Sequence, residues 1–193
     1  VADRARPQGS PAVVLGLARG GLPVAAEVAA AIEAPLDVLV VRKLGAPSQP
    51  EFAFGAIAEN EATFVNAATV DALGLAPGDI DRVLQRERAE TTRRILSYRG
   101  NRPLAGVRGR HVVLVDDGLA TGATMRAAVL FAQERGAATI TVAVPVGAPE
   151  TVDELRSEVH VVCLRTPEDF GSVGYWYADF DPPSDDEIRA LLR

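Results

Sequence analysis

Two adjacent carboxylates, Asp116 and Asp117, end an apolar run in the stretch VVLVDDGLATGATM at residues 112–125. The loop after them is made of small or hydroxylated residues, so successive backbone N–H groups can face one anion: Ala120, Thr121, Gly122, Ala123 and Thr124. A helix that starts near Gly122 would point its N-terminal dipole at the same anion. Because carboxylates repel a phosphate, we expect the acidic pair to accept hydrogen bonds from the vicinal hydroxyls of a ribose. A sugar phosphate is the simplest ligand that satisfies both halves.

Two further segments carry positive charge that could hold an anionic ligand. In GLARGG at residues 16–21, Arg19 precedes Gly20 and Gly21, whose missing side chains let backbone amides approach an anion. In LVVRKLGAP at residues 39–47, Arg42 and Lys43 could neutralise a pyrophosphate, although strand alternation would direct only one of them into a site. Taken singly, the two segments also fit an ordinary turn and a solvated strand end.

The elements that must position these residues follow from the apolar periodicity. We expect buried strands at residues 12–15, 36–42, 112–115, 139–144 and 159–164, and helices at residues 22–32, 79–99, 124–135 and 150–156. A hairpin is expected between residues 52–58 and 62–65. Strands that are apolar on both faces and alternate with helices predict an α/β fold with a parallel sheet covered on both sides. In such sheets ligands bind beyond the carboxyl ends of the strands, where both the acidic pair and Arg19 fall.

We interpret residues 1–193 as a single domain with a hairpin-and-helix insertion at residues 46–110 and a C-terminal hood segment at residues 167–193. The helix at residues 79–99 carries mixed charges at three- and four-residue spacing, which is typical of a solvated face. A contact with a second subunit, and with it a homodimer, is the alternative for this helix.

The composition of the chain indicates its cellular location and excludes some classes of partner. The longest apolar runs, such as residues 38–41, are far too short to span a bilayer, and we expect neither a leader segment nor a membrane partner. The single cysteine, Cys163, excludes an internal disulfide, so a cytoplasmic location is expected. The net charge of −6 argues against general nucleic-acid binding.

The stretch at residues 112–125 resembles the phosphoribosyl pyrophosphate motif of the type I phosphoribosyltransferases. The resemblance implies a Rossmann-like parallel sheet with helices on both faces. It also implies that Asp116 and Asp117 hold the ribose 2′ and 3′ hydroxyls while residues 120–124 wrap the 5′-phosphate. The loop with Arg19, Gly20 and Gly21 would grip the pyrophosphate, with a cis peptide bond between Ala18 and Arg19. The motifs RGG, RKLGAP and DDGLATGATM are together similar to those of uncharacterised bacterial phosphoribosyltransferase-like proteins.

Further roles are implied by particular branches of this family. The pair Arg42 and Lys43 resembles an Arg-Lys pair with which the orotate branch binds pyrophosphate. The segment PEDFGSVGYWYADF at residues 167–180 partly resembles the purine-holding segment of the hypoxanthine-guanine branch, with spacing that differs by one residue. It makes Phe170 and Trp176 candidate base contacts, and aromatic residues that merely cap the sheet are the alternative. At the position of Ala120 the hypoxanthine-guanine branch has an acidic residue. The adenine branch has alanine there, as this chain does.

The sequence therefore predicts an enzyme that transfers a 5-phosphoribosyl group from phosphoribosyl pyrophosphate to a nitrogenous base and releases pyrophosphate. Mg²⁺ is expected as cofactor, bound chiefly by the substrate diphosphate and water with help from Asp116 and Asp117. A non-catalytic regulator or sensor that binds phosphoribosyl pyrophosphate or a nucleotide is the main alternative. A sugar-phosphate hydrolase is less favoured because no nucleophile motif is present.

Overall fold

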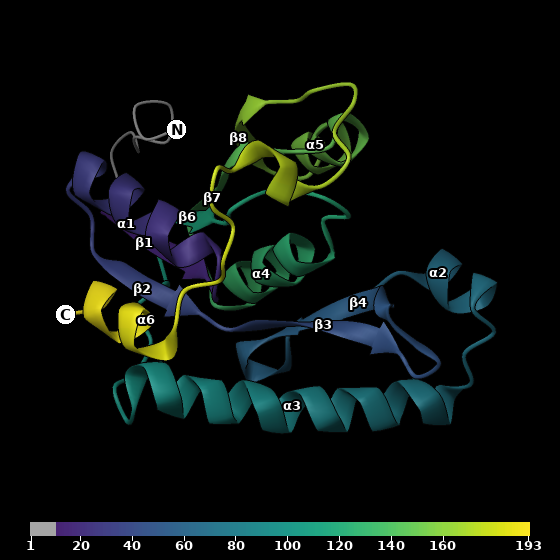
Figure 1. Cartoon of the computed structure of the whole chain (residues 1–193). Coiled ribbons are helices and arrows are strands. Elements are labelled where there is room, and N and C mark those ends of the chain that lie inside the picture. The colour runs from purple at the N-terminus through teal and green to yellow at the C-terminus, as the bar shows by residue number, and fades with distance from the viewer. Residues whose placement is uncertain (1–10) are drawn as a thin grey trace.

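The computed structural model describes residues 11–193, apart from the side chains of Glu51 and Asn60; residues 1–10 of the predicted single domain lie outside the described residues. Its main sheet has five parallel strands in the order β2-β1-β6-β7-β8 (Figure 1). The strands are β1 (Ala12–Leu17), β2 (Leu36–Leu39), β6 (His111–Val115), β7 (Thr139–Val146) and β8 (His160–Arg165). The parallel sheet predicted from the apolar runs is confirmed.

Helices cover both faces of this sheet, as the sequence predicts. On one face α1 (Gly21–Ile32) packs Ala25 and Val28 against Val14 and Val113. On the other face lie α4 (Ala123–Glu134) and α5 (Pro149–Arg156), whose apolar side chains join a core with alternate residues of the same strands. Each buried Val or Leu contributes roughly 1.5–3 kcal/mol relative to exposure, so alternation along the strands holds the three layers together.

The single strand predicted at residues 36–42 is wrong, because the chain changes sheets at Val40. β2 ends at Leu39, and β3 (Val41–Ala46) starts a separate antiparallel sheet. At the break, the Val40 N–H donates to Glu59 Oε1 (2.9 Å) and Arg99 Nη1 donates to the Val38 carbonyl (2.7 Å). Arg99 and Glu59 are themselves a buried ion pair. Side chains distant in sequence therefore satisfy the backbone where the strand stops.

The second sheet, in the order β3-β4-β5, contains the predicted hairpin. Its other strands are β4 (Gln49–Ala58) and β5 (Thr63–Val65), which pair antiparallel across a 3₁₀ turn at Glu59–Glu61. One face packs on α4 through Ala56 and Ala58. The other face packs through Phe54 and Ile57 on α3 (Pro77–Arg99), the long helix along the base of Figure 1. The second sheet is thus a packed layer between α4 and α3.

Two short helices were not expected from the sequence. α2 (Ala67–Ala72) follows β5, and α6 (Asp185–Leu191) lies near the C-terminus. Ile188 of α6 is fully buried with Leu22 of α1 and Tyr98 of α3. The C-terminal segment is thereby fixed to the core at its far end. Among the described residues no helix is both long and apolar enough to cross a bilayer.

Candidate active site

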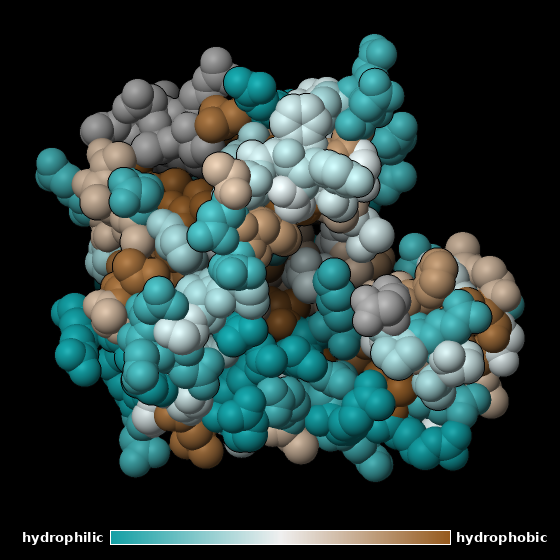
Figure 2. Space-filling view, in the orientation of Figure 1, coloured by the Kyte–Doolittle hydropathy of each residue, from teal (hydrophilic) through white to brown (hydrophobic). Residues whose placement is uncertain are grey.

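A pocket of about 810 Å³ opens where the strand order reverses. β1 and β6 are neighbours, but β1 continues through α1 to β2 on one side and β6 continues through α4 to β7 on the other. The loops after the two strands therefore diverge, which leaves a crevice at their carboxyl ends. Figure 2 shows this face hollowed between the C-terminal segment and the β3–β4 arm. The pocket contains most of the predicted site residues: Arg19, Gly20, Arg42, Lys43, Asp116, Asp117, Ala120, Thr121, Gly122 and Thr124.

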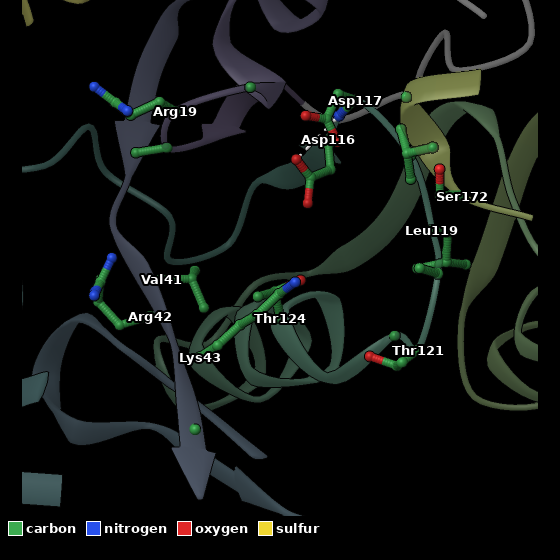
Figure 3. Close-up of a pocket in the computed structure, with 18 of the residues that line it drawn as sticks. Arg19, Val41, Arg42, Lys43, Asp116, Asp117, Leu119, Thr121, Thr124 and Ser172 are labelled. Atoms are coloured by element: carbon green, nitrogen blue, oxygen red, sulfur yellow. Dashed lines mark hydrogen bonds between the residues drawn. The ribbon is translucent and has the colours of Figure 1, made fainter. Parts of the chain in front are cut away.

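The carboxylates of Asp116 and Asp117 lie side by side in the pocket (Figure 3). The Asp117 N–H donates to Asp116 Oδ1 at 3.0 Å. Burial raises the pKa of Asp116 well above its usual range, and the charge of Asp117 raises it further. Burial also raises the pKa of Asp117, while the ammonium of Lys43 opposes both shifts. The charged pair is poorly solvated, so hydroxyl donors or a cation would stabilise it.

The acidic pair suits a Mg²⁺ ion that other groups also hold. Among the described residues, no three His, Cys, Asp or Glu side chains gather closely enough to enclose a metal ion. The protein would instead supply two carboxylates, those of Asp116 and Asp117, which line an open pocket. Mg²⁺ is commonly bound by one or two carboxylates together with waters and substrate phosphates, so this donor set fits the ion that the sequence analysis expects.

The loop after β1 packs directly against the acidic pair. The predicted cis peptide bond between Ala18 and Arg19 is present. A β-carbon on Gly20 would collide with Asp117 Oδ2, and one on Gly21 would lie 2.6 Å from the Val115 carbonyl oxygen. The two glycines thus let this loop approach β6 and its carboxylates. Gly20 lines the pocket, whereas Gly21 is buried at the start of α1.

Two backbone hydrogen bonds fix the loop at residues 118–122 to the end of β7 and the residues after it. The Leu119 N–H donates to the Val146 carbonyl (2.9 Å), and the Leu119 carbonyl accepts from the Ala148 N–H (2.8 Å). Gly122 adopts φ +74°, a left-handed conformation that favours glycine, and Ala123 is buried at the first position of α4. Within the described chain, the N–H groups of residues 120–122 have no acceptor. The loop is therefore a fixed set of donors beside a helix N-terminus, which suits a phosphate.

Two neighbouring cations of β3 differ in their surroundings. Lys43 and Arg42 leave the strand in different directions (Figure 3), yet both line the pocket, so the expectation that only one of them would enter it is wrong. Arg42 Nη2 lies 2.9 Å from Glu87 Oε2 of α3. Lys43 and Arg19, in contrast, form no ion pair within the described part of the chain. Their positive charge is thus the more available for a ligand.

The C-terminal segment closes one side of the pocket with residues that the sequence reasoning missed. Val173 and Phe180 line the pocket, and the Tyr177 hydroxyl donates to the Asp117 carbonyl at 2.6 Å. Burial and the two nearby carboxylates raise the pKa of Tyr177 to about 12, so this hydroxyl stays a donor. The candidate base contacts lie elsewhere in the segment: Trp176 Nε1 donates to the Phe170 carbonyl (3.0 Å), and neither ring is among the pocket-lining groups of the described residues.

Arg86 and Glu87 of α3 also line the pocket. The sequence reasoning assigned this helix a solvated face, yet Glu87 is only 5% exposed. A signal for it exists, because Glu87 follows Val83 and precedes Thr91 at four-residue spacing, and all three are buried. A single acidic residue on the buried face of a helix indicates that a specific positively charged side chain pairs with it.

Comparisons with known proteins place the chain among related proteins. Residues 2–178 match the family described as the phosphoribosyl transferase domain. A Mycobacterium tuberculosis (strain H37Rv) protein named "Putative phosphoribosyl transferase" is 46% identical over 185 residues, which are 95% of this chain but only 42% of that relative. A uracil phosphoribosyltransferase of Pseudarthrobacter chlorophenolicus is 34% identical over 93 residues, covering 46% of this chain and 44% of the relative.

A solved structure agrees with these matches. The crystal structure of TT1426 from Thermus thermophilus is 43% identical and superposes with a TM-score of 0.78, covering 95% of this chain and 87% of that chain. Family match, identity and fold lead to one conclusion. The chain belongs to the phosphoribosyl transferase domain family and has its type I fold.

Proposed function

We propose that the protein transfers a 5-phosphoribosyl group from phosphoribosyl pyrophosphate to a nitrogenous base and releases pyrophosphate. One observation carries the proposal: Asp116 and Asp117 stand in one pocket between the donor loop at residues 118–122 and the loop of Gly20. A ribose on the carboxylates would extend its 5′-phosphate toward one loop and its diphosphate toward the other.

In this proposal the acidic pair binds and orients the ribose. Its carboxylates accept hydrogen bonds from the 2′ and 3′ hydroxyls, and these bonds are strong because the carboxylates are poorly solvated. The N–H groups of residues 120–122 and the hydroxyls of Thr121 and Thr124 bind the 5′-phosphate. Both halves of the substrate are then fixed before the bond to pyrophosphate breaks.

Charge stabilisation of the leaving group is the second part of the proposal. Negative charge grows on the pyrophosphate as its bond to the ribose carbon breaks, and Lys43 and Arg19 are unpaired cations of the described pocket. Lys43 therefore takes the role that the sequence analysis assigned to both Arg42 and Lys43. Mg²⁺, when bound, would neutralise part of the diphosphate charge. A cytoplasmic setting belongs to the same proposal.

The test is pyrophosphate release from phosphoribosyl pyrophosphate and Mg²⁺ in the presence of purine and pyrimidine bases. Uracil belongs in the panel because a partly similar relative is named for it. We expect release that requires a base and that is lost in Asp116→Asn/Asp117→Asn. Binding of phosphoribosyl pyrophosphate without release for any base would favour the sensor instead.

A further inference from the structure

The wall of the pocket between β3 and α3 holds a buried acid between two arginines. Glu87 is 5% exposed and lies in contact with Arg42 of β3 and Arg86 of α3. All three residues line the same pocket as the acidic pair. A buried carboxylate needs one positive partner, and here it has two.

The hydrogen bonds orient both guanidinium groups and leave donors unused. Arg42 Nε donates to Glu87 Oε2 (3.0 Å), and Arg42 Nη2 lies in ion-pair contact with the same oxygen (2.9 Å). Arg86 Nε donates to Glu87 Oε1 (2.8 Å). Within the described residues, Nη1 of Arg42 and both terminal nitrogens of Arg86 have no acceptor. The Arg86 side chain is 60% exposed, so these donors can be reached from the pocket. The trio therefore has a net charge of +1 and a fixed fork geometry that matches a carboxylate.

A structural role alone leaves part of this arrangement unexplained. Arg42 by itself would tie β3 to α3 through Glu87, and Arg86 adds nothing to that link because it neighbours Glu87 on the same helix. The diphosphate already has Lys43 and Arg19 in the proposed mechanism. The unused donors of Arg86 and Arg42 are thus available to a second anionic group.

The chemistry of the acceptor points in the same direction. Apart from the acidic pair, Glu87 is the carboxylate among the described pocket-lining residues, and two arginines occupy both of its oxygens. Glu87 is therefore a poor proton acceptor for a base that must lose a proton. Ala120 offers no proton acceptor either. Within the described residues, this wall of the pocket thus presents cationic donors and a carboxylate that is already paired, which suits a ligand group with negative charge.

We infer that Arg86, held with Arg42 by Glu87, binds a carboxylate on the acceptor, which is a planar nitrogen heterocycle of anionic character. This inference rests on the proposed function and names the substrate class of the same pocket. Glu87 is the positioning residue, because it acts on the acceptor only through the two arginines.

Matched pairs of heterocycles that differ by a carboxylate test the inference. Orotate is compared with uracil, and nicotinate with nicotinamide, by calorimetry on the protein with and without phosphoribosyl pyrophosphate and Mg²⁺. We expect an anionic member to bind at least about tenfold more tightly than its neutral partner, as charge-assisted hydrogen bonds allow. Arg86→Ala should remove that preference and leave the affinity for phosphoribosyl pyrophosphate unchanged.

Two variants separate binding from general charge and from folding. Arg82→Ala is the matched control, because Arg82 lies on the same helix, pairs with Asp79 and does not line the pocket. Arg82→Ala should keep the preference. Arg86→Lys keeps the charge but not the fork and should restore it only in part.

The outcomes separate the two proposals. Equal affinity for anionic and neutral members in every pair would overturn the inference, and so would a preference that survives Arg86→Ala. An Arg86→Ala protein that loses affinity for phosphoribosyl pyrophosphate would assign the arginine to the diphosphate and overturn it as well. Anion binding that depends on Arg86 without any binding of phosphoribosyl pyrophosphate would support the anion site and defeat the proposed function.

Discussion

At the scale of single residues, Gly20 is where two loops of the pocket meet. A β-carbon there would collide with Asp117 Oδ2, which is the end of a flexible side chain. Gly20→Ala should therefore keep the fold but turn the carboxylate away, which would weaken binding of phosphoribosyl pyrophosphate by roughly tenfold to a hundredfold. Calorimetry measures this, with Gly106→Ala as the control because a β-carbon at Gly106 meets nothing within 4 Å. Equal affinities of the two variants would contradict the assigned contact.

Asp116 is expected to lower stability in exchange for binding. Its pKa is raised in the folded protein by burial and by Asp117, so ionisation of Asp116 favours the unfolded chain once the pH exceeds its unfolded pKa. Asp116→Asn removes this charge and should raise the Tm at neutral pH without Mg²⁺, by roughly 2–4 °C for each kcal/mol relieved. The difference should shrink as the pH falls and the wild-type carboxyl becomes protonated. Because the Asn side chain keeps an Oδ1 that can accept from the Asp117 N–H, a lower Tm for the variant at pH 7 would contradict this expectation.

At the scale of elements, the C-terminal segment is tied to the acidic pair by one hydroxyl. The bond from Tyr177 to the Asp117 carbonyl should contribute about 0.5–1.5 kcal/mol, and Tyr177→Phe removes it while the ring keeps its contact with Phe180. We expect a small loss of Tm and a larger loss of kcat/KM. Tyr175→Phe is the control, because Tyr175 is 83% exposed and does not line the pocket. Identical kinetics for both variants would mean that the segment does not position the carboxylates.

The elements also show what the sequence could and could not predict. The motif at residues 112–125 is local, so its strand, loop and helix were predicted nearly to their ends. The break at Val40 depends on Glu59 and Arg99, which lie far along the chain, and apolar periodicity cannot reveal such partners. Side-chain pairings across elements likewise hid Arg86 and Tyr177, since a charged helix and an aromatic cluster have common structural explanations. The loops of the candidate site could therefore be predicted from the sequence. The pocket-lining residues that α3 and the C-terminal segment contribute could not.

At the scale of the whole molecule, the pocket predicts which acceptors are poor. The side chain of Ala120 can neither accept nor donate a proton at the acceptor base. The carboxylate of Glu87 already accepts hydrogen bonds from two arginines. Hypoxanthine and guanine should therefore not have the highest kcat/KM in steady-state assays that also include adenine, xanthine, uracil and orotate. Either 6-oxopurine as the best substrate would show that another group of the pocket serves as the base.

We propose that two carboxylates and two loops together form one site for phosphoribosyl pyrophosphate. Isothermal titration with this ligand and Mg²⁺ tests it most directly, on the wild type and on Asp116→Asn/Asp117→Asn, with melting curves to verify that the variant is folded. We expect saturable one-to-one binding to the wild type and no measurable binding to the folded double variant. Equal affinity of the two proteins for phosphoribosyl pyrophosphate would show that the two carboxylates do not bind this ligand.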